Sequence, residues 1–259
     1  MDKAEALNAF DPSIWRRRAT HYSELSWVSA ADPMKEVFLR LKLQGSEFVV
    51  DVGTGSQAIL RAIEPFLGQG GRVIGFDLSP EMLGVGVAGG QWRPNVFVAD
   101  AKHIPLDDEI ADIVIARQVI HHIEDPREAI REMVRIVRPG GKIVVAEHVV
   151  MSSDLMGFER GLFDLKEPGR HLWLPDQLLK LLTENTVGFS KVDFIAGYIP
   201  GYSMIKDWAK NGGLSEEDQK RIFSYLNDAS DEIKQALNLE IAPDDVTMDG
   251  HYLCVISQK

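Results

Sequence analysis

Cysteine is almost absent from this chain, which has a single one, Cys254, among its 259 residues. One cysteine excludes an internal disulfide and a metal site built from several thiolates. Cys254 lies in the apolar run at 252–256, where we expect a packed thiol rather than a reactive one. A reduced thiol is consistent with a cytoplasmic protein, which is the localisation we expect.

Positive charge is also scarce, because 28 lysines and arginines stand against 39 acidic residues, a net charge of −11. Phosphate-rich partners need clustered cations, so this balance argues against a broad surface for nucleic acid or for an anionic membrane. The basic run at 16–18 is interpreted as a solvated helix face. No stretch approaches the roughly 18 apolar residues of a membrane span, and residues 1–10 contain no apolar signal region. We therefore expect no nucleic-acid partner and no membrane span.

Strand-like runs alternate with helical patterns, which predicts an α/β fold with a mostly parallel, doubly wound sheet. Hydrophobic residues make up 45% of the chain, and its length suits one α/β domain with a cap. The seven predicted strands are residues 48–52, 72–77, 96–99, 113–116, 142–147, 192–195 and 252–256. Residues 58–67 and 126–137 read as helices, and the turn at 138–141 leads from the second helix into a strand.

Two regions interrupt this alternation. Residues 1–45 precede the first strand and read as helices at 15–19 and 32–43. Residues 200–248 separate the last two strands, with helix-like patterns at 202–210 and 216–239. Connections in such folds usually have only a few residues besides their helix. We interpret residues 1–45 as a helical lid, 46–199 as the core, 200–248 as a helical substrate cap and 249–259 as the final core strand. A structural appendage is the alternative for 200–248.

A glycine turn directly follows the first predicted strand. Asp51 lies near the strand tip, and Gly53 and Gly55 alternate after it. A side chain at either glycine would keep a ligand away from the backbone, and the next helix offers free N–H groups to an anion. Asp51 adds a negative charge at the same place. A site with both signs suits an amino-acid ligand that carries an ammonium and a carboxylate group.

Three further features follow strands two, three and four: Asp77, Asp100 with Ala101, and the pair at 117–118. Ligands of open parallel sheets bind beyond the carboxyl ends of the strands, so these features should line one crevice. Asp77 can accept hydrogen bonds from both hydroxyls of a ribose, and Asp100 from the amine of an adenine. The alternative for each acid is the N-cap of the next helix. Apolar residues that could flank a flat base are Leu78, Met82 and Ile104.

The ordered motifs resemble class I S-adenosylmethionine-dependent methyltransferases, in the group of the ubiquinone and menaquinone methyltransferases. The matching blocks are VVDVGTG at 49–55, VIGFDLSPEML at 73–83, VADAKHIPLDDEIADIVIARQVIHHIEDP at 98–126 and EMVRIVRPGGKIVVAEH at 132–148. The resemblance implies a Rossmann-like core at 46–199, a last strand that is antiparallel beside the sixth, and S-adenosyl-L-methionine as cofactor, with S-adenosyl-L-homocysteine as product. The cofactor-binding residues that it implies are Asp51, Gly53, Thr54, Gly55, Ser56, Asp77, Leu78, Met82, Asp100, Ala101, Arg117 and Gln118.

Gln57 is a departure from the family pattern, which usually has a third glycine at this place. Either the turn is less open or Gln57 points away from the ligand. Residues 53–58 also match the G-x-G-x-x-A pattern of dinucleotide sites. Asp51 argues against that interpretation, because its carboxylate would face a pyrophosphate. A nicotinamide-dependent oxidoreductase is therefore the weakest of the functions we consider.

The resemblance implies methyl transfer, and transfer to an oxygen or carbon atom also needs a base. His148, His121 and His122 follow strands five and four and are the candidate catalytic residues, with a structural role as the alternative. No pair has the helix spacing of a metal site, so no metal is expected. The predicted acceptor is a small apolar or aromatic molecule, and the candidate substrate-binding residues are Tyr22, His171, Trp173 and Tyr202.

Two other functions fit the same motifs. One is a fold relative that binds the cofactor but catalyses a cyclisation or isomerisation, and the other is a non-catalytic binding protein. The sequence names neither the acceptor nor the oligomeric state, and it leaves a homo-oligomer open.

Overall fold

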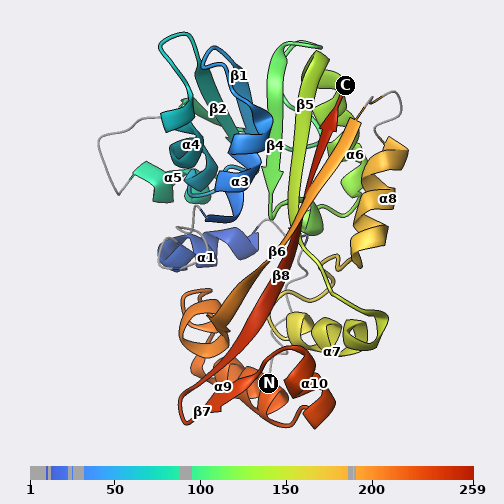
Figure 1. The fold of residues 1–259 in the computed structure, drawn as a ribbon. Helices are drawn as coiled ribbons and strands as arrows, with labels where there is room; N and C mark the ends of the chain where they lie inside the picture. The colour runs from blue at the N-terminus through green and yellow to red at the C-terminus, as the bar shows by residue number, and fades with distance from the viewer. Residues whose placement is uncertain are drawn as a thin grey trace.

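The fold is an α/β sheet with a helical cap at one end (Figure 1). The computed structural model describes residues 10, 13–22, 25, 32–87, 95–185, 189 and 191–259. The sheet order is β3-β2-β1-β4-β5-β8-β6, with β7 paired to β8. The strands are β1 (Phe48–Val52), β2 (Arg72–Asp77), β3 (Asn95–Val98), β4 (Ala111–Arg117), β5 (Val137–His148), β6 (Lys191–Ser203), β7 (Glu240–Ala242) and β8 (Asp245–Gln258).

Strands β1 to β5 pair in parallel, and β8 runs antiparallel between β5 and β6. The predicted fold class, including the antiparallel last strand, is confirmed. All five residues of β1 are buried, as expected for a β-branched strand at the centre of a sheet covered on both faces. The winding direction reverses between β1 and β4, so the carboxyl ends of these strands open into one crevice.

The predicted count of seven strands is wrong, because the sheet has eight. The additional strand, β7, has three exposed residues and forms a hairpin with the start of β8, where Ala242 pairs with Asp245. So short and exposed a strand has no apolar alternation that the sequence could reveal. Strands β6 and β8 also extend well beyond their predicted bounds, because their outer ends leave the core and enter the cap (Figure 1).

Helices cover both faces of the sheet. On one face, α3 (Asp32–Leu41) and α4 (Ala58–Ile63) pack against the strands, and α4 continues into the 3₁₀ helix η1 (Glu64–Phe66). On the other face lie α6 (Pro126–Ile136) and α8 (Pro175–Asn185). Helix α5 (Pro80–Val87) follows β2, and the 3₁₀ helix η2 (Ile120–His122) follows β4. Helix α1 (Ser13–Tyr22) packs on α5, between the core and the cap (Figure 1).

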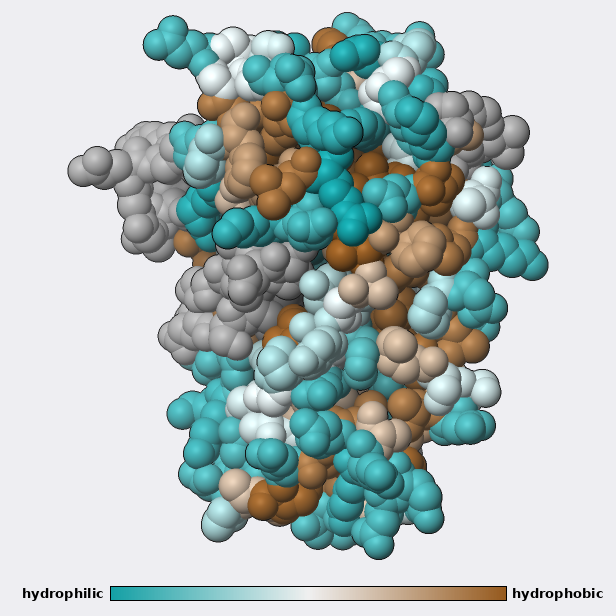
Figure 2. Space-filling model, viewed as in Figure 1, coloured by the Kyte–Doolittle hydropathy of each residue, from teal (hydrophilic) through white to brown (hydrophobic). Residues whose placement is uncertain are grey.

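The cap has a hydrophobic core of its own. Its elements are α7 (Ser153–Asp164), the π-helix η3 (Met204–Ala209), α9 (Glu216–Asn227), α10 (Asp231–Ala236) and the outer end of β8. The helix expected at 216–239 is two helices, because Ser230 begins α10 as an N-cap that accepts from the N–H of Ile233. Hydrophilic residues predominate over the cap on the face shown in Figure 2.

A bilayer-spanning helix is absent from the part of the chain that the structure describes, since every helix there is too short or too polar.

Candidate functional site

The glycine turn after β1 is built by backbone contacts with β2. The N–H of Thr54 donates to the carbonyl of Phe76 (2.9 Å), and the N–H of Gly55 donates to Asp77 Oδ2 (2.8 Å). Gly53 has φ +67°, and a Cβ there would lie 2.3 Å from the Val119 side chain. Gly53 is therefore required for packing against Val119, and not only for access of a ligand to the backbone. At Gly55 the nearest atom to an added Cβ is 3.4 Å away, so the turn is open at this residue.

Gln57 points away from the turn's open side. It adopts a left-handed backbone with φ 65°, is fully buried, and donates from Nε2 to the carbonyl of Leu83 (2.9 Å). The left-handed conformation costs a non-glycine residue roughly 1–2 kcal/mol. Of the two possibilities that the sequence left open, the structure therefore favours a side chain directed into the protein. The missing third glycine does not close the turn.

A cavity that we call the glycine-turn cavity lies beyond the carboxyl ends of β1, β2 and β4. All twelve predicted cofactor-binding residues line it: Asp51, Gly53, Thr54, Gly55, Ser56, Asp77, Leu78, Met82, Asp100, Ala101, Arg117 and Gln118. The base-flanking residue proposed at Ile104 is not among its lining residues and packs in the core instead.

Two carboxyl groups of this cavity, those of Asp51 and Asp77, have raised pKa values. Asp51 is 1% exposed, and burial raises the pKa of its carboxyl group to about 7. Its Oδ2 atom has no hydrogen-bond partner among the described residues. Burial also raises the pKa of Asp77, although Oδ1 accepts from Ser79 N (2.9 Å) and Oδ2 accepts from Gly55 N. Asp51 is thus a buried acid that a cationic ligand would stabilise in its charged form.

Asp100 makes a local bond of the kind expected for a turn. Its Oδ1 atom accepts from the N–H of Lys102 (2.9 Å). Each carboxylate oxygen has two lone pairs, so this bond leaves acceptor capacity on the cavity side. The local role and a ligand-binding role are therefore compatible at Asp100, as they are at Asp77.

A second cavity, which we call the histidine cavity, lies between the core and the cap. It is lined by the three candidate histidines, by Tyr22 and Tyr202, and by residues of α1, α7, η3 and β8. The two cavities meet, because five residues line both of them: Trp15, Tyr22, Arg117, Gln118 and His122. Trp15 also contacts His122 edge-on, with ring centroids 4.6 Å apart. Helix α1 thus covers the place where the two cavities join.

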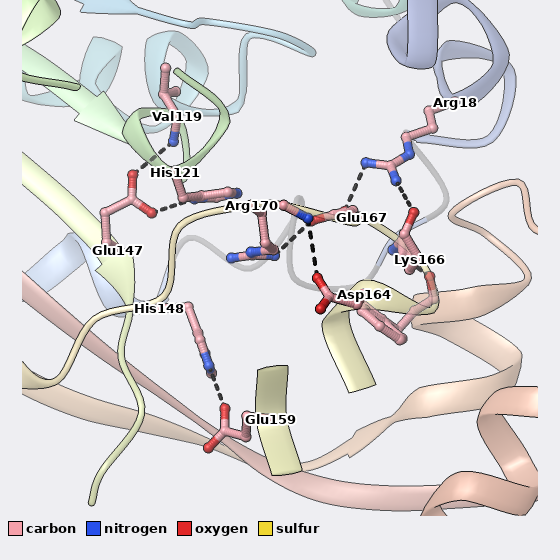
Figure 3. Close-up of polar contacts among 12 residues, drawn as sticks. Arg18, Val119, His121, Glu147, His148, Glu159, Asp164, Lys166, Glu167 and Arg170 are labelled. Carbon is pink, nitrogen blue, oxygen red and sulfur yellow. Dashed lines mark hydrogen bonds and ion pairs between the residues drawn. The ribbon is translucent and has the colours of Figure 1, made fainter. Parts of the chain in front are cut away.

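His121 is oriented by a buried carboxylate. Its Nδ1 atom lies 2.5 Å from Glu147 Oε2, and Glu147 Oε1 accepts from the backbone N–H groups of Val119 and Ile120 (both 2.9 Å). Figure 3 shows this dyad beside the ribbon of η2. Burial, with the nearby Arg170 cation, holds the pKa of His121 well below its usual range, and burial raises the pKa of Glu147 to about 7. The imidazole is therefore neutral near pH 7 and can accept a proton.

A second histidine has the same kind of partner. His148 Nε2 lies 2.8 Å from Glu159 Oε2, which reaches it from α7 (Figure 3). His122 differs, because its Nδ1 atom is buried with no hydrogen-bond partner among the described residues. Burial and the ring of His121 hold the pKa of His122 well below its usual range. The cavity therefore presents three histidines in two environments.

Charged residues form a buried network in the wall of the histidine cavity. Glu167 accepts from Arg18 through Oε1 and from Arg170 through Oε2 (both 2.7 Å), as Figure 3 shows. Arg18 also donates to the carbonyl of Lys166 (3.1 Å), which ties α1 to the segment after α7. Lys166 Nζ donates to the carbonyl of Trp208 (2.7 Å), and burial lowers its pKa to about 7.

One triad in this wall has ligand atoms close enough for a metal ion. The groups are His121, His122 and Glu167, with one atom from each within 4.8 Å of the others. Both oxygens of Glu167 are already bound by arginines, and His121 Nδ1 is bound by Glu147. The triad therefore belongs to the charged network, in which cations already surround Glu167.

Two predicted substrate residues lie behind the histidine cavity and not in its wall. His171 stacks on Trp173 (centroids 5.6 Å apart) and lies with Nε2 3.1 Å from the carbonyl of Ile123. Its backbone N–H donates to the carbonyl of His121 (3.1 Å). Trp173 packs in the core. The pair supports the segment that carries His121.

Several charged residues of the site were missed in the sequence: Arg18, Glu147, Glu159, Lys166, Glu167 and Arg170. They were passed over because a charge in a helical segment usually marks a solvated face. A signal was present at 166–170, where three charged residues fall within five positions.

Comparison with known proteins agrees with this geometry. Residues 50–145 match the family described as a methyltransferase domain. The chain is 26% identical over 199 residues to an uncharacterized methyltransferase, YcgJ, of Bacillus subtilis, an alignment that covers 72% of this chain and 73% of the relative. It is 24% identical over 224 residues to demethylmenaquinone methyltransferase of Oceanobacillus iheyensis, covering 84% of this chain and 90% of the relative.

Solved structures share the fold. The crystal structure of YcgJ from Bacillus subtilis superposes with a TM-score of 0.73 at 21% identity, covering 87% of this chain and 97% of that one. Phosphoethanolamine N-methyltransferase 2 of Haemonchus contortus, in complex with phosphomonomethylethanolamine and S-adenosylhomocysteine, has a TM-score of 0.57 at 20% identity, covering 88% and 52%. The resemblance to class I S-adenosylmethionine-dependent methyltransferases that the sequence predicts is confirmed.

Proposed function

We propose that this protein transfers the methyl group of S-adenosylmethionine to an oxygen or carbon atom of a small, apolar or aromatic molecule. One observation carries the proposal: the glycine-turn cavity and the histidine cavity meet at a wall that both share. A donor in the first cavity can therefore face an acceptor in the second. Helix α1, the described part of the expected lid that lies at both cavities, covers this site, and residues 200–248 supply part of the acceptor side.

The glycine-turn cavity fits a ligand with an amino-acid end and a nucleoside end. Asp51 has an unpartnered oxygen and binds the ammonium group in this proposal. The open turn at Gly55 lets the ligand lie against the backbone. Asp77 accepts from the ribose hydroxyls with the lone pairs that its backbone bonds leave, and Asp100 accepts from the adenine amine. Arg117 and Gln118 lie at the shared wall, toward the methionine end.

When bound, S-adenosylmethionine supplies a methyl group that is already activated on a positively charged sulfur. The protein's tasks are to align the acceptor, to exclude water and, for an oxygen or carbon acceptor, to remove a proton. The buried walls of the two cavities and the cover provided by Trp15 and Tyr22 serve the first two tasks. Tyr22 and Tyr202 contact the acceptor in this proposal.

The proton acceptor is one of the three histidines. His122 lies at the shared wall, where transfer would occur, and its Nδ1 atom has no partner among the described residues. His121 and His148 are each oriented by a carboxylate, which leaves their second ring nitrogen for an acceptor. We propose His122 as the nearest base, with His121 and His148 positioning the acceptor or sharing the proton.

The test combines binding with turnover. Calorimetry should detect S-adenosylmethionine binding to the wild-type protein and no comparable binding of NAD. With labelled S-adenosylmethionine and a panel of phenols, quinols and amines, at least one acceptor should become methylated. Replacing His122, His121 or His148 by Asn should lower kcat by about 10²-fold or more for the true base. Cofactor affinity should stay unchanged in the His121 and His148 variants, because neither residue lines the glycine-turn cavity. His103→Asn, which changes an exposed histidine outside both cavities, is the matched control.

The two rival functions give different results in the same experiment. A cyclase or isomerase would bind the cofactor and convert an acceptor without consuming the methyl group. A non-catalytic binding protein would bind the cofactor and convert none. Absence of cofactor binding would contradict both methyl transfer and the cyclase or isomerase.

A further inference from the structure

The wall of the histidine cavity carries more positive than negative charge. Arg18, Lys166 and Arg170 lie there and are 5%, 8% and 5% exposed, and Glu167 is the carboxylate between them. Asp207, from η3, is a further acidic group that acts on Lys166. With Arg117, which also lines this cavity, four basic side chains and one carboxylate, Glu167, form the charged part of its lining, an excess of positive charge. Such a charge is costly to keep out of water unless an anion accompanies it.

Two of these cations have donors to spare. Arg170 is 5% exposed and donates to Glu167 through Nη1. Its Nε–H group has no acceptor among the described residues. Lys166 donates to the carbonyl of Trp208, and no carboxylate of the described residues lies within 4.0 Å of its Nζ atom. The two side chains are separated by only four positions in one segment. Both residues line the histidine cavity, where an anionic ligand would meet their positive charges.

The electrostatics of the neighbouring groups favour an anion over a cation. Burial lowers the pKa of Lys166 to about 7, and the cations Arg18 and Arg170 lower it further. Burial likewise holds the pKa values of His121 and His122 below their usual range, and Arg170 contributes to both shifts. The contribution of the two arginines opposes a further cation such as a metal ion, whereas an anion would be stabilised by the same charges.

The rest of the cavity is shaped for a flat apolar body. Aromatic side chains form much of its wall: Trp15, Tyr22, Phe163, Tyr202, Trp208 and Tyr252. Trp208 also lies under the Lys166 ammonium group, 4.4 Å from it, and Phe163 lies 4.3 Å from the Arg170 guanidinium. The cations therefore sit on the aromatic wall, where they can meet the charged end of an aromatic acid.

We propose that the acceptor is a flat aromatic carboxylic acid whose carboxylate binds at the end of the cavity lined by Lys166 and Arg170, with its nucleophilic atom directed toward the wall shared with the glycine-turn cavity. This inference rests on the proposed methyl transfer, and it names the substrate class for that same site. The proposal extends the sequence expectation of an apolar or aromatic acceptor by adding one negative charge.

The test uses the full chain saturated with S-adenosylhomocysteine. Three pairs of probes differ only in charge: 4-hydroxybenzoate with 4-hydroxybenzamide, 3,4-dihydroxybenzoate with its amide, and 6-hydroxy-2-naphthoate with its amide. Calorimetry should show that at least one acid binds about tenfold or more tightly than its amide, as expected for a charge-assisted hydrogen bond. Lys166→Met should remove most of this preference while leaving S-adenosylhomocysteine affinity unchanged. Lys210→Met, at an exposed lysine of the cap, should keep the wild-type preference.

Each outcome decides between the proposals. Equal binding of acid and amide, failure of every acid to bind at millimolar concentration, or an unchanged preference in Lys166→Met would overturn the carboxylate site while S-adenosylhomocysteine still binds. Loss of S-adenosylhomocysteine binding in the wild-type protein would instead contradict the proposed function. If Lys166→Met fails to bind S-adenosylhomocysteine, Lys166→Gln is measured in the same way, because it keeps a polar end without the charge.

Discussion

Asp51 shows how a single residue separates two classes of ligand. Its carboxyl group is 1% exposed and has an oxygen without a partner among the described residues. Burial raises its pKa to about 7, so it is partly protonated near neutral pH before a ligand arrives. An ammonium group would stabilise the charged form, and a pyrophosphate would not. The preference for an amino-acid ligand thus follows from one buried acid.

We predict that S-adenosylhomocysteine binding releases a proton from Asp51. Because the bound ammonium lowers the raised pKa, affinity should increase as pH rises from about 6 to 7 and level off above it. Calorimetry near pH 6.5 in two buffers with different ionisation enthalpies measures the proton directly. Asp51→Asn should abolish the release and weaken binding. Identical heats in the two buffers would contradict the assignment.

Gly53 is predicted to be a packing residue as much as a ligand-access residue. An added Cβ would meet Val119 at 2.3 Å, and φ is +67°, so Gly53→Ala should lower the free energy of unfolding by about 2–4 kcal/mol. Val119→Ala should recover part of that loss in the double variant. A double-mutant cycle from chemical denaturation measures this coupling. Strictly additive effects would show that the contact is relieved elsewhere.

Helix α1 lies where the two cavities meet, and two of its arginines bind residues of other segments. Arg18 reaches Glu167 and the carbonyl of Lys166, and both arginine and glutamate are buried. Arg16 reaches Glu81 on α5, but the arginine side chain is 75% exposed. Buried charge pairs are strongly coupled, whereas exposed ones contribute little. The attachment of α1 to the cap side should therefore depend on Arg18.

The matched pair of variants Arg18→Met and Arg16→Met tests this attachment. Arg18→Met should increase amide hydrogen exchange throughout α1 and speed the release of S-adenosylhomocysteine several-fold, because Trp15 and Tyr22 lose their anchor. Arg16→Met should change both quantities little. Equal effects of the two variants would mean that Arg18 has no special role in holding α1.

The sequence predicted the core elements better than the cap. Strands β1 and β2 have their predicted bounds, because each is an apolar run that ends in a glycine or an acid. Strand β7 was missed, since its three residues are exposed. The twelve cofactor-cavity residues were predicted from their places at strand ends together with the family motifs. Glu159 and Glu167 could not be placed, because their partners His148 and Arg18 lie 11 and 149 positions away in the sequence and only the fold brings them together.

At the scale of the molecule, the cap and the core share one long antiparallel ribbon. Strands β6 and β8 run from the sheet into the cap, and the outer end of β8 packs in the cap's hydrophobic core. Figure 1 shows the ribbon spanning both parts. The histidine cavity lies along this ribbon, so its wall draws residues from both parts of the protein. The proposed acceptor site is therefore formed by the core and the cap together, whereas the glycine-turn cavity lies at the core.

Binding of S-adenosylmethionine in the glycine-turn cavity can be measured by a single series of titrations. S-adenosylhomocysteine is titrated calorimetrically into the wild-type protein, into Asp77→Ala, and into the surface control Asp176→Ala on α8. We predict one site per chain in the wild type and the control, and binding weakened by about tenfold or more in Asp77→Ala, which removes the proposed ribose acceptor. No heat in the wild type, or an affinity unchanged in Asp77→Ala, would contradict the account.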